Sequence, residues 1–249
     1  MKISFCIITL NEEANLSRCL SSCRDLADEI LVLDSGSTDG TASIAREHGA
    51  RFEFQPWPGY VAQKNRVLEL ATNDWVFSLD ADEELSPELR AEILQLKNAG
   101  PPSDTAGFSL PRCVFYEGRW IRHGDWYPDR LVRCFYRRKA RFDGGKVHER
   151  LLVDGPVREW KGELRHYSFR DAADHLDRCR KYARLWAESQ HESGRKASWW
   201  SPAGHAGFRW LRSYIFRGGW LDGSLGLRIA NFAAYEVWLK YSTLRALNK

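Results

Sequence analysis

The chain has 249 residues, of which 43% are hydrophobic and 28% charged, and its formal net charge is +4. These proportions are typical of a globular protein with a sizeable core and exclude a disordered or fibrous chain. No apolar run reaches the roughly 18 residues of a membrane-spanning helix. The N-terminal sequence enters a strand directly and lacks the pattern of a signal peptide, so we expect a cytosolic protein. Six scattered cysteines favour buried or free thiols over a structural zinc site.

Strands and helices are predicted to alternate along the first hundred residues. The predicted strands are residues 3–10, 29–34, 51–55 and 75–79, and all but the short third one are largely apolar. The helices between them are predicted to end near Cys23, His48 and Leu70. Such alternation with short connections predicts a parallel α/β sheet covered on both faces. Ligands bind such sheets at the carboxyl ends of the strands.

Two carboxylates, Asp80 and Asp82, follow the fourth predicted strand and are separated by Ala81. In an extended backbone, residues i and i+2 point the same way, so both carboxylates can face one ligand. Adjacent carboxylates repel unless a positive charge lies between them, and a divalent cation on phosphate oxygens meets that need. A solvated Asp-rich turn before a helix capped at Ser86 explains the same residues. The pair alone does not decide between the two.

Polar residues also follow the first two strands, at residues 10–12 and 34–39. The second cluster suits a tight turn and a helix N-cap. It also suits a ligand site, because Asp34 offers an acceptor for a ribose hydroxyl or a base N–H, and Gly36 admits close approach. Three such clusters from distant sequence are predicted to meet at one rim. The chain lacks Gly-x-Gly-x-x-Gly and Gly-Lys-Ser/Thr loops, which disfavours a dinucleotide-binding domain and a P-loop NTPase.

Four segments in order carry a resemblance: Ile-Ile-Thr-Leu-Asn-Glu-Glu, Leu-Val-Leu-Asp-Ser-Gly-Ser-Thr-Asp-Gly-Thr, Gln-Lys-Asn and Leu-Asp-Ala-Asp-Glu. Over residues 1–95 the chain resembles a family 2 glycosyltransferase with the GT-A fold. The resemblance implies a UDP-sugar donor and Mg²⁺ or Mn²⁺, with Lys64 facing phosphate and Asp82 holding the cation. His148 is a further metal candidate, and a purely structural histidine is an equal alternative. The implied donor-site residues are Thr9, Leu10, Asn11, Glu12, Asp34, Ser35, Gly36, Asp39, Gln63, Lys64, Asn65, Asp80, Ala81 and Asp82.

Residues 101–170 mix short β-like runs with aromatic and acidic clusters, a composition that suits sugar recognition. Inverting transfer needs one general base on the acceptor hydroxyl, and the candidates are Asp125, Asp129 and Glu149. Asp129 is slightly favoured because its motif lies among aromatics. Trp-Tyr-Pro-Asp, Arg-Leu-Val-Arg and Val-His-Glu resemble the lipopolysaccharide core β-1,4-glucosyltransferases of Gram-negative bacteria.

The last part of the chain differs in composition. A helix is predicted from Asp171 to about Glu192. From Arg195 onward the chain contains nine Lys and Arg but only two Asp and Glu, together with many aromatic residues. Interrupted helices of this composition favour an anionic membrane surface over nucleic acid. Packing beneath the catalytic domain or at a dimer contact is the alternative. In the membrane interpretation, Arg209, Arg212 and Arg217 face lipid.

The sequence therefore predicts an inverting glycosyltransferase on the inner face of the bacterial inner membrane. We expect it to move a sugar, with glucose as the first candidate, from a UDP-sugar to the inner-core heptose of lipopolysaccharide or lipooligosaccharide. The alternatives are transfer to a polyprenyl-linked saccharide in capsule or exopolysaccharide synthesis, a metal-dependent nucleotidyltransferase, and a non-catalytic nucleotide-sugar binder. The expected division is a donor-binding half (1–100), an acceptor-binding half (101–170) and a helical membrane-associating region (171–249).

Overall fold

The computed structural model describes residues 1–144 and 149–248. The chain divides into two compact units. The first comprises Met1–Arg112 and Asp129–His166, and the second comprises Cys113–Pro128 and Tyr167–Lys249. Residues 113–128 thus group with the C-terminal helices. The predicted division at residues 100 and 170 concerns ligand-binding roles and stays a prediction.

The first unit begins with four parallel strands in the order β3-β2-β1-β4. Their bounds match the predicted ones within a residue: β1 (Ile3–Thr9), β2 (Glu29–Asp34), β3 (Arg51–Phe54) and β4 (Trp75–Asp80). Thr9 is in register with Asp34, and Ile8 with Asp80. The three polar clusters therefore meet at one edge of the sheet, as the alternating pattern predicted.

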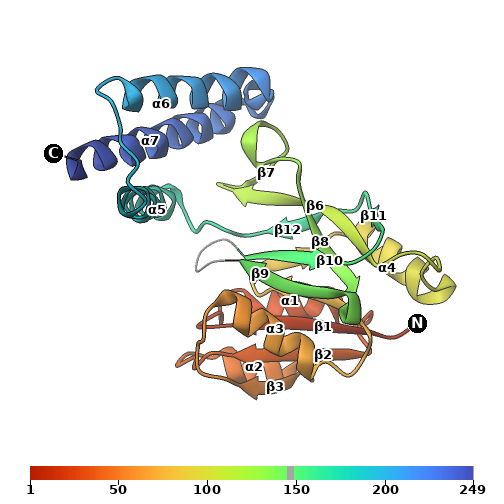
Figure 1. Ribbon diagram of the computed structural model, residues 1–249. Coiled ribbons are helices and arrows are strands. Elements are labelled where there is room, and N and C mark those ends of the chain that lie inside the picture. The colour runs from red at the N-terminus through yellow and green to blue at the C-terminus, as the bar shows by residue number, and fades with distance from the viewer. Residues whose placement is uncertain (145–148, 249) are drawn as a thin grey trace. The chain divides into compact units, whose positions relative to one another are not determined.

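Helices cover both faces of these strands (Figure 1). They are α1 (Leu16–Cys23), α2 (Thr41–Glu47), α3 (Tyr60–Leu70) and α4 (Pro87–Ala99). Ile3, Phe5 and Ile7 of β1 belong to a hydrophobic cluster with α1, α2 and α4. Cys6 belongs to a second cluster with α3. Because side chains alternate along a strand, this division explains why β1 is apolar apart from Ser4 and Thr9.

Beyond β4 the sheet continues with strands that pair mostly antiparallel. The elements are β5 (Glu83–Leu85), β6 (Gly107–Tyr116), β8 (Asp129–Tyr136), β11 (Val157–Glu159), β12 (Leu164–His166) and a short 3-10 turn, η2 (Arg137–Lys139). β8 pairs antiparallel with both β4 and β6, and β12 pairs with β5. A separate hairpin joins β9 (Ala140–Gly144) to β10 (Glu149–Val153). The α/β prediction is confirmed, with a mixed sheet whose N-terminal half is parallel.

The second unit is mostly helical. Its elements are β7 (Arg119–Ile121), η1 (Gly124–Trp126), α5 (Ala172–Glu192), α6 (Ser201–Leu211), a π-helical turn η3 (Arg212–Phe216), η4 (Gly219–Asp222) and α7 (Gly223–Leu247). α7 packs along both α5 and α6. The second unit has a small hydrophobic core formed by Tyr116, Ile121, Leu225 and Ile229. Within residues 1–144 and 149–248, no helix has the length and hydrophobicity needed to span a membrane.

Candidate active site

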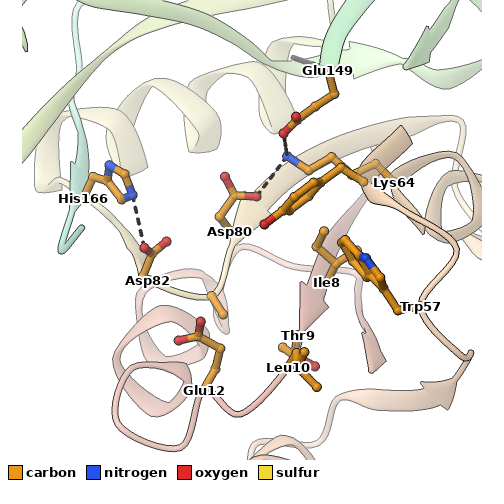
Figure 2. A pocket seen from close by; sticks show the side chains of 12 residues that line it. Ile8, Thr9, Leu10, Glu12, Trp57, Lys64, Asp80, Asp82, Glu149 and His166 are labelled. Atoms are coloured by element: carbon orange, nitrogen blue, oxygen red, sulfur yellow. Dashed lines mark hydrogen bonds and ion pairs between the residues drawn. The ribbon is translucent and has the colours of Figure 1, made fainter. Parts of the chain in front are cut away.

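A cavity of about 560 Å³ opens at the carboxyl ends of β1 and β4 in the first unit. Figure 2 shows the side chains that surround it. They come from β1 and the loop after it, from α3 and its approach, from β4 and its loop, and from β10 and β12. The lining residues are Ile8, Thr9, Leu10, Glu12, Trp57, Tyr60, Lys64, Asp80, Ala81, Asp82, Glu149 and His166.

Asp34 ends β2 with a buried side chain that organises the following loop. One carboxylate oxygen accepts hydrogen bonds from the backbone N–H groups of Gly36 and Ser37, each at 2.8 Å. The other accepts from the hydroxyls of Thr9 (2.8 Å) and Ser37 (2.5 Å). Burial alone would raise the pKa of Asp34, but these hydrogen bonds outweigh it and lower the pKa. Four donors saturate the carboxylate, so its contact with a nucleotide stays a prediction.

The loops after β1 and β2 are joined by side-chain hydrogen bonds. Asn11, with a left-handed backbone (φ 56°), accepts from the Thr38 N–H at 2.9 Å through its side-chain oxygen. Asp39 accepts from the backbone N–H groups of Glu13 (3.1 Å) and Thr41 (3.0 Å). Asn11 and Asp39 thereby fix the rim from which Leu10 and Glu12 reach the cavity. Neither lines the cavity itself.

Lys64 is the cation at the centre of the cavity. Its ammonium lies 3.2 Å from Asp80 Oδ1 and 3.4 Å from Glu149 Oε1, and its side chain is 8% exposed. Figure 2 shows Lys64 reaching between these two carboxylates. α3 supplies the lysine, β4 supplies Asp80 and β10 supplies Glu149. The predicted phosphate-facing lysine therefore lies beside the predicted Asp-x-Asp pair.

Flanking residues of the Gln-Lys-Asn segment hold the structure around Lys64. The Gln63 side-chain amide donates to the Ser35 hydroxyl at 3.2 Å. The Asn65 side chain donates to the Phe142 carbonyl and accepts from the Phe142 N–H, both at 2.9 Å. Asn65 thus joins α3 to the hairpin that carries Glu149. Gln63, Asn65, Ser35 and Gly36 do not line the cavity.

Arg133 on β8 holds the Asp-x-Asp loop in place through ion pairs with carboxylates. Its guanidinium donates to Asp80 at 2.7 Å and to Glu83 at 2.5 Å. Glu83 is fully buried and accepts from the Asp80 backbone N–H at 2.9 Å. Burial alone would raise the pKa of Asp80, but Arg133 and Lys64 outweigh it and hold that pKa well below its usual range. Asp80 is therefore ionised at neutral pH.

Asp82 faces a histidine that sequence reasoning missed. The His166 Nε2 atom lies 3.2 Å from Asp82 Oδ2, and both side chains line the cavity (Figure 2). An imidazole and a carboxylate are a donor set that suits a divalent transition metal. Among the described residues, His, Cys, Asp and Glu form no group of three or more that could hold a metal ion. The pair fits a cation that takes its other ligands from a bound diphosphate.

The charge balance of the cavity favours a cation. Its lining contains the carboxylates of Glu12, Asp80, Asp82 and Glu149 against the single ammonium of Lys64 and one imidazole. Burial raises the pKa of Glu12, and the carboxylates of Asp82, Asp39 and Asp80 raise it further. A diphosphate would meet net repulsion in this lining unless a divalent cation accompanied it.

The base candidates lie in different surroundings. Glu149 lines the cavity. Asp129, at the start of β8, lies outside the lining and accepts from Arg112 at 2.7 Å and 3.1 Å. Asp125 belongs to the second unit, where its side chain is 4% exposed among arginines. That burial leaves Asp125 poorly placed to meet an acceptor hydroxyl. His148 lies outside the described residues.

Two aromatic residues at the cavity also escaped the sequence analysis. Trp57 and Tyr60 are 45% and 47% exposed, and their rings meet edge to face with centroids 4.7 Å apart. Both line the cavity. Exposed rings at a polar cavity offer stacking faces for a base or a sugar. Trp57 lies between two prolines in the loop before α3 and belongs to no motif that the sequence analysis used, so nothing in the sequence marked it as a site residue.

Strand order, cavity and charged residues together define an α/β protein with a carboxylate-rich cavity at the carboxyl ends of its parallel strands. The model of glycosyl transferase family 2 matches residues 4–152. The chain belongs to this family, which confirms the predicted GT-A fold and glycosyltransferase class and sets the nucleotidyltransferase alternative aside.

Relatives extend the similarity to nearly the whole chain. The lipopolysaccharide core biosynthesis glycosyltransferase LpsC of Rhizobium meliloti is 33% identical over 246 residues, covering 96% of this chain and 90% of LpsC. The glycosyltransferase RT0209 of Rickettsia typhi is 28% identical over 256 residues, covering 99% and 88%. Glucosyl-3-phosphoglycerate synthase of Mycobacterium tuberculosis, solved with Mn²⁺, UDP and glucosyl-3-phosphoglycerate, is 28% identical with a TM-score of 0.36. That match covers 47% of this chain and 44% of the synthase.

Proposed function

We propose that this glycosyltransferase moves a sugar, with glucose as the first candidate, from a UDP-sugar to the inner-core heptose of lipopolysaccharide or lipooligosaccharide, with inversion. The cavity carries the donor half of the proposal, because four carboxylates surround one lysine at the carboxyl ends of β1 and β4. The 33% identity with LpsC, whose name states lipopolysaccharide core biosynthesis, supports the acceptor half.

The donor diphosphate would lie between Lys64 and the Asp82–His166 pair. Asp82 and His166 would hold Mg²⁺ or Mn²⁺, which when bound would neutralise the charge that develops on the departing UDP. The Lys64 ammonium lies within 3.4 Å of two carboxylates in the cavity, so it can turn from them toward a phosphate bound there. Arg133 fixes Asp80 so that the loop keeps its shape when Lys64 moves.

The sugar is transferred in one displacement. A carboxylate removes the proton from the acceptor hydroxyl, the hydroxyl oxygen bonds to C1 of the sugar, and the bond from C1 to the phosphate oxygen breaks. Glu149 is our first candidate for the base, because it lines the cavity and can accept a proton once Lys64 turns toward phosphate. Asp129 is the second, because it lies outside the cavity lining and already accepts hydrogen bonds from Arg112.

The acceptor is lipid-anchored in this proposal, so the enzyme would work as a peripheral protein on the inner face of the inner membrane. The aromatic and basic second unit supports this location. Trp199, Phe208 and Phe216 are 78%, 62% and 72% exposed there, which is unusual for large apolar side chains in a soluble protein.

A donor and acceptor screen tests the function. UDP-glucose, UDP-galactose and UDP-N-acetylglucosamine are offered with truncated core oligosaccharides ending in heptose, and the product linkage is read by NMR. We expect transfer from UDP-glucose to heptose in a β-linkage. Transfer only to a polyprenyl-linked saccharide would assign the enzyme to capsule or exopolysaccharide synthesis instead. Donor binding without any transfer would contradict the proposal.

A further inference from the structure

Three arginines of the second unit surround one buried carboxylate. Asp125 lies in η1 with a side chain 4% exposed. The Nε atoms of Arg209, Arg212 and Arg217 lie 3.1, 3.4 and 3.5 Å from its oxygens. The sequence interpretation had these arginines facing lipid. That was incomplete, because all three also turn toward an internal acid.

This cluster carries an excess of positive charge. One carboxylate faces three guanidinium groups, and the nearby acids of the unit have other partners. Asp222 pairs with His123 at 2.9 Å, and Glu117 pairs with Arg228. The three arginine side chains are 33%, 40% and 46% exposed, so their remaining N–H groups can reach an outside ligand. Two positive charges are therefore left to be balanced from solution.

Hydrogen bonding inside the cluster is also incomplete. Both oxygens of Asp125 and the Nε atom of Arg209 are buried, and none of them has a hydrogen-bond partner among the described residues. The ion pairs are thus close in distance but poorly aligned. A carboxylate in this position gathers the guanidinium groups without saturating them. Their planar forks remain available for an anion that can accept two parallel N–H bonds, as phosphate does.

Close backbone packing holds the arginine-bearing turn in place. The Gly124 N–H donates to the Arg217 carbonyl at 2.9 Å, which ties η1 to the end of η3. A Cβ atom at Gly219 would lie 2.6 Å from the Ser213 carbonyl oxygen, and one at Gly226 would lie 1.8 Å from the Gly219 carbonyl oxygen. Larger residues would force these segments apart. The cluster is therefore presented by a tightly packed turn, so an anion would pay little to order it.

Exposed apolar side chains flank the arginines along the same segment. Phe208 precedes Arg209, and Phe216 precedes Arg217, with 62% and 72% of their surfaces exposed. Trp220 follows on η4 and is 54% exposed. Large apolar side chains beside unbalanced guanidinium groups match the two layers of a bilayer surface, where phosphate lies above hydrocarbon. A free phosphate ion in water has no apolar part that could contact the exposed rings.

We propose that Arg209, Arg212 and Arg217, gathered by Asp125, bind the phosphate of an anionic lipid headgroup while Phe208, Phe216 and Trp220 enter the bilayer beside it. This inference rests on the membrane location in the proposed function and gives it a specific site. The three arginines form a lipid-binding site on the protein, and this site does not include the residues proposed to bind the donor.

Vesicle binding by matched variants tests the site. The probes are phosphatidylcholine vesicles with and without phosphatidylglycerol, measured by sedimentation of the full chain. The variant R212Q/R217Q removes two charges but leaves Arg209 to pair with Asp125. The control R180Q/R184Q removes two exposed charges from α5, where both arginines pair within the helix. We expect R212Q/R217Q to bind phosphatidylglycerol vesicles about 30-fold more weakly, since each basic residue near the surface contributes a factor of about five. The control should lose less than about threefold.

A second variant distinguishes a site from diffuse attraction and also serves if R212Q/R217Q fails to fold. R212K/R217K keeps the charge but loses the planar forks. A specific phosphate site predicts weaker vesicle binding by this variant, whereas diffuse attraction predicts unchanged binding. Equal losses in R212Q/R217Q and R180Q/R184Q, or full binding by R212K/R217K, would overturn the proposal. So would inorganic phosphate shifting the Nε–Hε NMR signals of these arginines while R212Q/R217Q bound vesicles normally, because the ligand would then be a free phosphate.

The outcome is separable from that of the proposed function. Site-dependent vesicle binding without transfer to any core oligosaccharide would refute the function and leave the lipid site standing. Transfer to a soluble core oligosaccharide by a chain that ignores phosphatidylglycerol would refute the lipid site alone.

Discussion

Replacing Arg133 with methionine should destabilise the first unit strongly, because Arg133 is the main counter-ion of two carboxylates. Its side chain is 6% exposed, and it lies 2.5 Å from Glu83, which is fully buried, and 2.7 Å from Asp80. Removing one partner of a buried ion pair typically costs about 3–5 kcal/mol, since the charge left behind has lost both water and partner. We expect Arg133→Met to lower the free energy of unfolding by about that amount.

A double-mutant cycle separates this charge effect from lost packing. Glu83→Gln removes the buried charge but keeps the side chain's shape, so R133M/E83Q should recover roughly 1–3 kcal/mol of the loss relative to additivity. Urea unfolding at neutral pH, followed by tryptophan fluorescence, gives the four free energies. Arg138→Met is the control, because Arg138 is 67% exposed beside Asp74 and should matter by less than about 1 kcal/mol. Additive effects of the two substitutions would refute the charge argument.

Three further outcomes are expected. Glu149→Gln should lower kcat by two to four orders of magnitude with near-normal UDP-sugar binding, whereas Asp129→Asn should lower it less; the reverse order in steady-state kinetics would make Asp129 the base. Trp57→Ala should raise the KM for the UDP-sugar about tenfold at unchanged unfolding free energy, and an unchanged KM would remove Trp57 from the donor site. Burial lowers the pKa of His175 to about 4, so its contribution to stability is complete above the unfolded pKa of about 6.5 and is lost as pH falls toward 4; near pH 5 the loss is about 2 kcal/mol, and His175→Gln, measured by urea unfolding, should lack it.

Most of the first unit could be predicted from the sequence, because local pattern and tertiary environment agree there. β1 is mostly apolar because both of its faces are covered, and its apolar run therefore predicts a buried strand. Asp80 and Asp82 could be placed at the strand ends for the same reason. Parallel strands in adjacent positions end at one edge, which brings Thr9, Asp34 and Asp80 together before any contact is known.

Residues whose role depends on antiparallel pairing could not be found in this way. His166 ends a strand of three residues that pairs with another of three, β5, and such short runs have no periodicity to detect. Arg133 was noted only as part of Arg-Leu-Val-Arg, and nothing in the nearby sequence indicates that it pairs with Asp80. The role of Asp125 was obscured for a different reason. Its three partners lie at least 84 residues later in the chain, on a π-helical turn and the segments around it.

The proposed activity depends most on a divalent cation that Asp82 and His166 hold for the UDP-sugar. Electron paramagnetic resonance of Mn²⁺, titrated into the protein with UDP present, measures that binding directly. Wild type and the control His48→Ala, a histidine outside the cavity that contacts Ser17, should bind one Mn²⁺ with similar affinity. Asp82→Ala and His166→Ala should each weaken binding by at least tenfold and lower transfer in parallel. Unchanged Mn²⁺ affinity in both variants, with transfer intact, would contradict the assignment of the metal site.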